Sequence, residues 1–167
     1  SIDADDRTDI GKGMPDWTYG LNLNVSWKNF DLSMMWQGTM GNDIYDATRR
    51  TDISATNLPS WMLNRWTGEG TSNRIPRFML GDNTNWQSSD LYVYDGSYLR
   101  LKNIQIGYTL PAALTQKVFV SSLRFYVAAE NLLTFTKYHG FDPEISTVNG
   151  QDYPQHKVLT LGVNVKF

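Results

Sequence analysis

Cysteine is absent from this sequence of 167 residues. Its absence excludes disulfide bonds, thiolate metal sites and cysteine nucleophiles. Long apolar runs are also absent. No stretch approaches the roughly 18 to 20 residues that a membrane-spanning helix needs, and the opening stretch SIDADDRTDI lacks the basic and apolar regions of a signal peptide. The sequence excludes a spanning helix, but not the strands of a membrane β-barrel, which alternate and leave little hydropathy signal.

The sequence also lacks an excess of charge of either sign and any pattern typical of an enzyme site. Fifteen basic and 17 acidic residues give a net charge of -2, which argues against nucleic acid as a partner. The histidines, His139 and His156, have no partner at a metal or catalytic-triad spacing. Asp142 and Glu144 form a carboxylate pair in FDPE, but acid–base catalysis needs a shaped cleft that one loop does not indicate. We predict a protein that is not an enzyme.

Aromatic residues, in contrast, are abundant, and they mark the ends of the alternating stretch WTYGLNLNVSW at 17–27. Steps of about 3.3 Å per residue at a tilt of about 40 to 45° give this stretch a height of about 23 to 25 Å, which matches an outer-membrane apolar band. Trp and Tyr favour both lipid interfaces because their rings are apolar while their polar groups stay near water. We expect this face to contact outer-membrane lipid, with interface aromatics at Trp17, Tyr19, Trp27 and Trp36.

Similar alternation recurs along the chain and predicts an all-β fold, an antiparallel up-and-down segment of a transmembrane β-barrel with long extracellular loops. The whole chain, 1–167, forms one portion of such a barrel domain. It divides into a loop at 1–16, a hairpin at 17–39, a long extracellular loop at 40–94, a hairpin at 95–137, a loop at 138–155 and a closing strand at 156–167.

One strand changes phase in its middle. Leu99 and Leu101 keep one phase and Ile104 and Ile106 the other, which predicts a β-bulge near Lys102. The connections alternate between short and long, so the long ones should meet at one end of the sheet. Outer-membrane barrels have this asymmetry, with short periplasmic turns and longer extracellular loops.

An alternative remains open, because a soluble extracellular β-sandwich that binds glycans shows the same alternation on one face of a sheet. For the barrel, five strands are too few to enclose an aqueous lumen, and an open sheet would leave two unpaired edges in lipid. We therefore expect further strands from the rest of the same protein or from another chain.

Four stretches carry a family resemblance: PDWTYGLNLNVSWKNFDLSMMWQGTMGNDIYD, YDGSYLRLKNIQIGYTLP, LRFYVAAENLLTFTKYHGFDPE and the terminal LTLGVNVKF. Their order and spacing resemble the carboxy-terminal end of a SusC/RagA-type TonB-dependent outer-membrane transporter of the Bacteroidetes. The resemblance implies the last five strands of a barrel of the 22-stranded size. It also reads GFDPE as a loop motif, for which we favour a structural role.

The resemblance further implies partners and two terminal features. The partners are the remaining amino-terminal barrel and plug, the TonB complex acting through that plug, a SusD-like surface lipoprotein that lids the barrel, and an oligosaccharide or peptide cargo. Phe167 is similar to the terminal signal that the barrel-assembly machinery recognises. SIDADD is similar to the second half of an acidic calcium loop, with Asp3 and Asp6 as later ligands; because the first half is missing, a solvated acidic loop is the favoured interpretation and no cofactor is expected.

If the apolar face meets lipid, the intervening polar residues face the lumen. These candidates are Tyr98, Arg100, Lys102, Arg124, Tyr126 and Glu130. A turn centred near 115 to 116 places Glu130 close to Arg100 and Lys102, where opposite charges would satisfy one another. Such charges either form a wall that substrate passes or contact the plug, and the second interpretation is favoured.

Tryptophans also lie in the long loop. Trp61, Trp66 and Trp86 could stack on sugar rings, contact the lipoprotein lid or pack within the loop itself.

Overall fold

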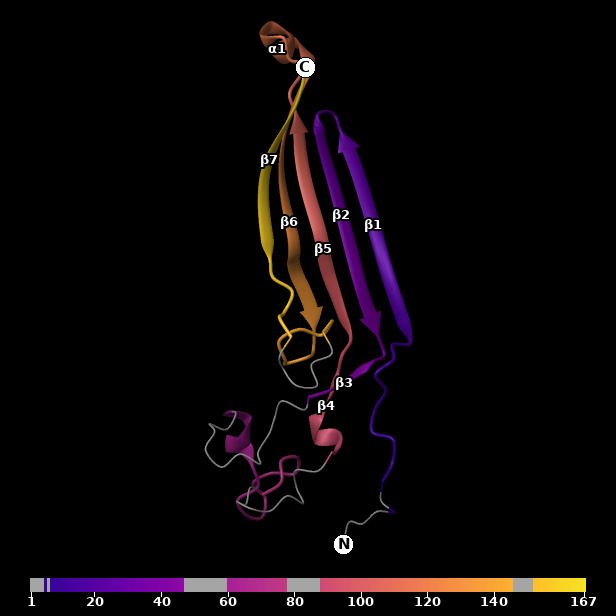
Figure 1. The fold of residues 1–167 in the computed structure, drawn as a ribbon. Coiled ribbons are helices and arrows are strands. Elements are labelled where there is room, and N and C mark those ends of the chain that lie inside the picture. Colours follow the sequence, from indigo (N-terminus) through magenta and orange to yellow (C-terminus); the bar gives the residue numbers. More distant parts are fainter. Residues whose placement is uncertain (1–4, 6, 47–59, 78–87, 146–151) are drawn as a thin grey trace.

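The structure is a computed structural model that describes residue 5 and residues 7–46, 60–77, 88–145 and 152–167. Its main element is a tall antiparallel sheet of five strands in the order β1-β2-β5-β6-β7 (Figure 1). The strands are β1 (Trp17–Trp27), β2 (Phe30–Met40), β5 (Tyr98–Thr109), β6 (Ser122–Thr136) and β7 (Val158–Lys166). Each strand pairs with the next one of the five along the chain, so the sheet is an up-and-down meander.

The strand register sorts the side chains onto two chemically different faces. Leu21 is opposite Trp36, which is opposite Leu101, which is opposite Leu133. Because successive residues of a strand point to opposite faces, these rows give one face that is apolar across all five strands. We call it the apolar face. The other, the polar face, carries Asn, Ser, Thr, Gln and the charged residues of the strands.

Two adjacent strands carry bulges at the same height. Lys102 has no partner in the β2–β5 register, where Met35 is opposite Asn103 and Trp36 is opposite Leu101, so the predicted bulge is confirmed. A second bulge lies in β6, where Asn131 and Leu132 lie between the residues paired with Asn103 and Leu101. Asn131 has a φ of 51° there, the left-handed conformation that asparagine tolerates.

Glycines let large side chains cross between strands. Tyr19 on β1 lies across Gly38 of β2, and its hydroxyl donates a hydrogen bond of 3.1 Å to the carbonyl oxygen of Tyr98 on β5. A Cβ atom on Gly38 would lie 2.6 Å from the Tyr19 ring. Tyr126 on β6 crosses Gly162 of β7 in the same way. Tyr19 therefore joins three strands, β1, β2 and β5, instead of two.

The described parts of the long connections lie together at one end of the sheet, as the alternation of connection lengths predicts (Figure 1). Within the longer one, β3 (Asp43–Tyr45) and β4 (Val93–Asp95) pair as a small second sheet, which the sequence pattern did not predict. This sheet lies beyond the end of β2 and β5 (Figure 1). No second sheet covers the apolar face among the described residues, as a β-sandwich would require.

The described helices are short. They are η2 (Ser60–Asn64), η4 (Asp90–Tyr92), α1 (Ala112–Thr115) and η5 (Gln116–Val118). Among the described residues no helix has the length and apolar character needed to cross a membrane.

Candidate functional site: the polar face at the long-connection end

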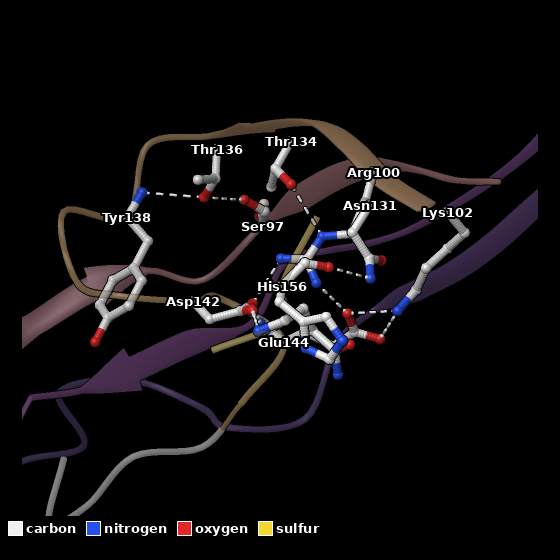
Figure 2. A network of polar contacts seen from close by, with 11 residues as sticks. Ser97, Arg100, Lys102, Asn131, Thr134, Thr136, Tyr138, Asp142, Glu144 and His156 are labelled. Atoms are coloured by element: carbon white, nitrogen blue, oxygen red, sulfur yellow. Dashed lines mark hydrogen bonds and ion pairs between the residues drawn. The ribbon is translucent and has the colours of Figure 1, made fainter. Parts of the chain in front are cut away.

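Arg100 is the centre of a buried ionic network on the polar face. Its Nη2 donates to Asp142 at 2.6 Å, its Nη1 to Glu144 at 2.5 Å, and its Nε to the hydroxyl of Thr134 at 2.9 Å (Figure 2). The side chains of Arg100 and Asp142 are only 4% and 3% exposed. The planar guanidinium fork suits this arrangement, because it can present several N–H groups in fixed directions.

Lys102 completes the network from the bulge. Its Nζ lies 2.7 Å from one oxygen of Glu144 and 2.8 Å from the other. Asp142 also accepts hydrogen bonds from the backbone N–H groups of Glu144 and Gln155, at 3.0 and 2.9 Å. Two carboxylates of the 137–157 connection therefore fasten that connection to the wall. We call Arg100, Lys102, Asp142 and Glu144 the clamp.

The predicted position of Glu130 beside Arg100 is wrong, although Glu130 does lie near Lys102 in the strand register. Glu130 is opposite Asn103, while Arg100 is opposite Thr134. The register is displaced from the expected one because the turn is centred later in the chain and the β6 bulge adds a residue. The carboxylates that neutralise Arg100 come instead from the FDPE motif, as its favoured structural role suggests.

Aromatic contacts hold the same connection at its start. Tyr138 is buried and packs edge-on against Tyr94 of β4, with ring centroids 6.2 Å apart. The Tyr138 N–H donates to the hydroxyl of Thr136, and that hydroxyl donates to the carbonyl of Ser97 (Figure 2). The connection thus contacts both the main sheet and the small one.

The electrostatics of the clamp favour a charged Asp142. Burial raises the pKa of its carboxyl group, but hydrogen bonds from Arg100 and from the Glu144 and Gln155 N–H groups outweigh burial, so the pKa lies below its ordinary value. The aspartate is therefore ionised at neutral pH, and its charge is balanced by Arg100.

Acid should loosen the hold of Asp142 on the clamp. A lowered pKa in the folded state gives stabilisation that is fully present above about pH 4 and is lost as the pH falls through the folded-state pKa. Hydrogen exchange of the Glu144 and Gln155 amides, corrected for intrinsic rates, should show lower protection at about pH 3 than at pH 7. The amide of Leu161 in β7 is the control. Equal protection of the clamp amides at both pH values would contradict this assignment.

A second ion pair crosses the sheet near its other end. Arg124 of β6 donates to both carboxylate oxygens of Asp31 on β2, and its guanidinium lies 5.2 Å from the ring centre of Tyr126. The intervening strand has Gly107 at this level, where a Cβ atom would lie 2.4 Å from Nη2 of Arg124. The glycine leaves the space through which the two charged groups meet.

Comparison with known proteins gives a consistent result, although no protein-family model matches the chain. TonB-dependent receptor P3 of Formosa agariphila is 36% identical over 99% of this chain, and TonB-dependent receptor SusC of Bacteroides thetaiotaomicron is 25% identical over all of it. A structure of the RagAB peptide importer in its closed-closed state matches the whole chain with a TM-score of 0.82 and 31% identity. The chain belongs to the SusC/RagA-type TonB-dependent outer-membrane transporters.

The chain spans 18% of receptor P3, 17% of SusC and 19% of the matched RagAB chain. It is an all-β segment of the barrel of a SusC/RagA-type transporter. Its five strands leave one edge of β1 and one of β7 without a partner among the described residues, which is where the neighbouring barrel strands would pair.

The predicted interface aromatics of this SusC/RagA-type segment lie on the apolar face. Trp17 and Trp27 are at opposite ends of β1 and are 66% and 64% exposed. Trp36 stacks on Phe135 with ring centroids 6.4 Å apart. Tyr19 differs, because its hydroxyl is bound to the backbone of β5 instead of pointing away from the sheet. Contact of these rings with lipid stays a prediction.

The lumen candidates lie on the polar face, with different surroundings. Tyr98 and Arg100 are buried under the 137–157 connection, whereas Glu130 is exposed. Sequence reasoning missed the pairing of Asp142 and Glu144 with Arg100 and that of Asp31 with Arg124. For the second pair, the one available signal was the alternation of β2, which places Asp31 on the polar face opposite Gly107.

The tryptophans of the long loop are only partly placed. Trp61 is half-buried in η2 beside buried Met62. Trp66 is 36% exposed, and its backbone N–H donates to the carbonyl of Ile75 at 2.9 Å. Trp86 lies outside the described residues. Their binding roles stay predictions.

The roles of the two terminal features stay predictions. Asp3 and Asp6 lie outside the described residues. Among the described part of the chain, no group of three or more metal-ligating side chains is present. Phe167 follows β7 with an 88% exposed side chain, and its role as an assembly signal stays a prediction.

Proposed function

We propose that the chain is part of the wall of a TonB-dependent importer in the outer membrane, with its long connections outside the cell. The importer takes up oligosaccharides or peptides together with a SusD-like lipoprotein, and it is not an enzyme. The observation that carries the proposal is the register, which gives one apolar face across five strands and one polar face behind it. The matched importer and receptors support the same function.

The polar face suits neutral cargo. Between the clamp and the Asp31–Arg124 pair, the inward positions of the strands are mostly uncharged, with Glu130 as the charged side chain among them. The amide and hydroxyl side chains at these positions are Asn22, Asn24, Ser33, Asn103, Gln105 and Thr160. Such groups donate and accept hydrogen bonds, as the hydroxyls of a sugar or the amides of a peptide require. The charged residues at both ends already have partners within the chain.

Transport should depend on the full-length protein and on its lipoprotein partner. We expect uptake of one labelled cargo class, oligosaccharide or peptide, in cells that express both, and its loss when the transporter, the lipoprotein or TonB is deleted. On a denaturing gel, an outer-membrane fraction should give a band much larger than 19.1 kDa that shifts on boiling. A soluble band that does not shift would contradict the membrane location, and unchanged uptake after deletion would contradict the importer function.

Trp66 is the described loop tryptophan best exposed for binding. We expect Trp66→Ala to weaken binding of cargo or of the lipoprotein by about tenfold, because an aromatic contact contributes about 1 to 2 kcal/mol. Leu63→Ala is the matched control, since Leu63 is 78% exposed in the same 60–77 segment. Calorimetric titration with each ligand separately distinguishes the two roles. Equal affinities for Trp66→Ala and the wild type would assign the tryptophan to loop packing.

A further inference from the structure

The connection between β5 and β6 lies at the end of the sheet opposite the long connections (Figure 1), and it presents exposed apolar side chains. It spans 110–121 and contains α1 and η5. Leu114 in α1 is 54% exposed and Phe119, just after η5, is 92% exposed. Neither side chain is covered by the described residues, and neither takes part in the polar face.

This exposure belongs to a well-fixed segment. The Leu110 N–H donates to the carbonyl of Leu123, and the Ser121 N–H to that of Lys166, which ties both ends of the connection to the sheet. Thr115 is 3% exposed and closes the helical turn from inside. A phenylalanine held out from such a segment is not the result of a loose loop.

The conformation and the exposure of Phe119 both cost free energy. Its φ of 60° lies in the left-handed region, which side chains other than glycine and asparagine rarely adopt. Its ring is also almost completely exposed, although apolar surface favours removal from water. Glycine would be the usual residue at such a helix end. An apolar surrounding for the ring would offset both costs.

The segment continues the apolar face. Tyr108, Phe125 and Val165 lie at the ends of β5, β6 and β7 beside this connection, and Trp27 and Phe30 lie at the neighbouring turn. In the proposed importer that face meets lipid. The exposed Leu114 and Phe119 therefore adjoin a surface that is already apolar.

The charge at this end is positive. Lys28 in the β1–β2 turn and Lys117 in η5 are exposed, and Lys28 lies 4.6 Å above the ring of Trp27. Asp31 is the acidic residue of the neighbouring turn region, 26–31, and Arg124 neutralises its charge. Lysine ammonium groups beside an apolar side chain are the arrangement by which proteins bind anionic phosphate headgroups at a membrane surface.

We propose that the 110–121 connection anchors the barrel in the lipid interface at this end, with Leu114 and Phe119 inserted among the lipids and Lys28 and Lys117 on headgroup phosphates. The proposal rests on the proposed function in one respect. With the long connections outside the cell, this end lies at the inner, phospholipid leaflet.

A fluorescence measurement on the full-length transporter in phospholipid nanodiscs tests the anchor. Because these 167 residues contain no cysteine, Phe119→Cys and Leu114→Cys give defined labelling sites for an environment-sensitive dye in the full-length protein once any cysteine elsewhere has been replaced. We expect blue-shifted emission and several-fold stronger quenching by nitroxide lipids than by iodide, with a label depth of about 5 to 10 Å below the headgroups. Gln116→Cys, a polar exposed position of the same turn, should be quenched mainly by iodide.

Two further variants separate the possible failures. Leu161→Cys on the apolar face of β7 should be quenched by nitroxide lipids whether or not the anchor exists, so its quenching by iodide would overturn the membrane location itself. Lys117→Gln should reduce the difference in nitroxide quenching of the label at 119 between anionic and zwitterionic nanodiscs. With Leu161→Cys behaving as expected, quenching of both anchor labels by iodide would overturn the anchor, and protection from both quenchers would assign the surface to a protein partner.

Discussion

Replacing Asp142 by asparagine is expected to detach the 137–157 connection from the wall while the barrel itself stays folded. The amide puts an N–H group opposite either the Arg100 guanidinium or the Gln155 N–H, so one buried hydrogen bond becomes a contact between two donors. Removing one partner of a buried ion pair costs roughly 3 to 5 kcal/mol. Because Glu144 still neutralises Arg100, we expect a local loss of about 2 kcal/mol, or about 30-fold faster amide exchange at Glu144 and Gln155.

Asp152→Asn is the matched control, because Asp152 lies exposed in the same connection. It should leave both amides unchanged. Arg100→Lys should give an intermediate result, since an ammonium group cannot present the three-directional fork that Thr134, Asp142 and Glu144 share. If Asp142→Asn exchanged like Asp152→Asn, the connection would be held mainly by the contact of Tyr138 with Tyr94.

Replacing Gly38 by alanine is expected to destabilise the sheet more than any other substitution of a strand glycine by alanine. The new Cβ atom would lie 2.3 Å from the backbone carbonyl oxygen of Tyr98, which cannot turn aside as a side chain can. Strands β2 and β5 must separate locally, and the Tyr19 ring must leave its place. Overpacking of this kind costs about 1 to 3 kcal/mol and the lost hydrogen bond about 1 kcal/mol. Unfolding in guanidinium from lipid vesicles should show a loss of about 2 to 4 kcal/mol.

Gly20→Ala provides the control, because a Cβ atom at Gly20 of β1 would meet its neighbour at an ordinary 3.6 Å. That variant should be neutral or slightly more stable, since alanine loses less backbone entropy than glycine. Tyr19→Phe isolates the hydrogen bond and should cost about 1 kcal/mol. A Gly38→Ala protein as stable as Gly20→Ala would show that β2 and β5 can adjust without cost.

The strands and their faces could be predicted from the sequence because their signal is local. A period of two over 17–27 suffices to place alternate residues on one face, and the change of phase between Leu101 and Ile104 suffices to place a bulge. The small sheet of β3 and β4 escaped detection because its strands have three residues each. Alternation over so short a run cannot be distinguished from chance.

The clamp could not be predicted because it depends on the path of a connection. Arg100 and Asp142 are 42 residues apart in sequence, and no periodicity links a strand to a loop that folds back over it. The expected partner, Glu130, was chosen from the strand register alone. A register estimated from the centre of a turn fails by two or three residues when the turn contains helical segments and the strand carries a bulge, as both do here.

The paired bulges at Lys102 and Asn131 have a consequence for the shape of the whole barrel. The radius of a closed barrel depends on its number of strands and on its shear, the total stagger of the strands around the circumference. Each bulge changes the stagger of one strand pair by one residue, and both occur at the same height. The shear contributed by these strands therefore differs above and below that height, so this part of the wall cannot have the curvature of a uniform cylinder from end to end.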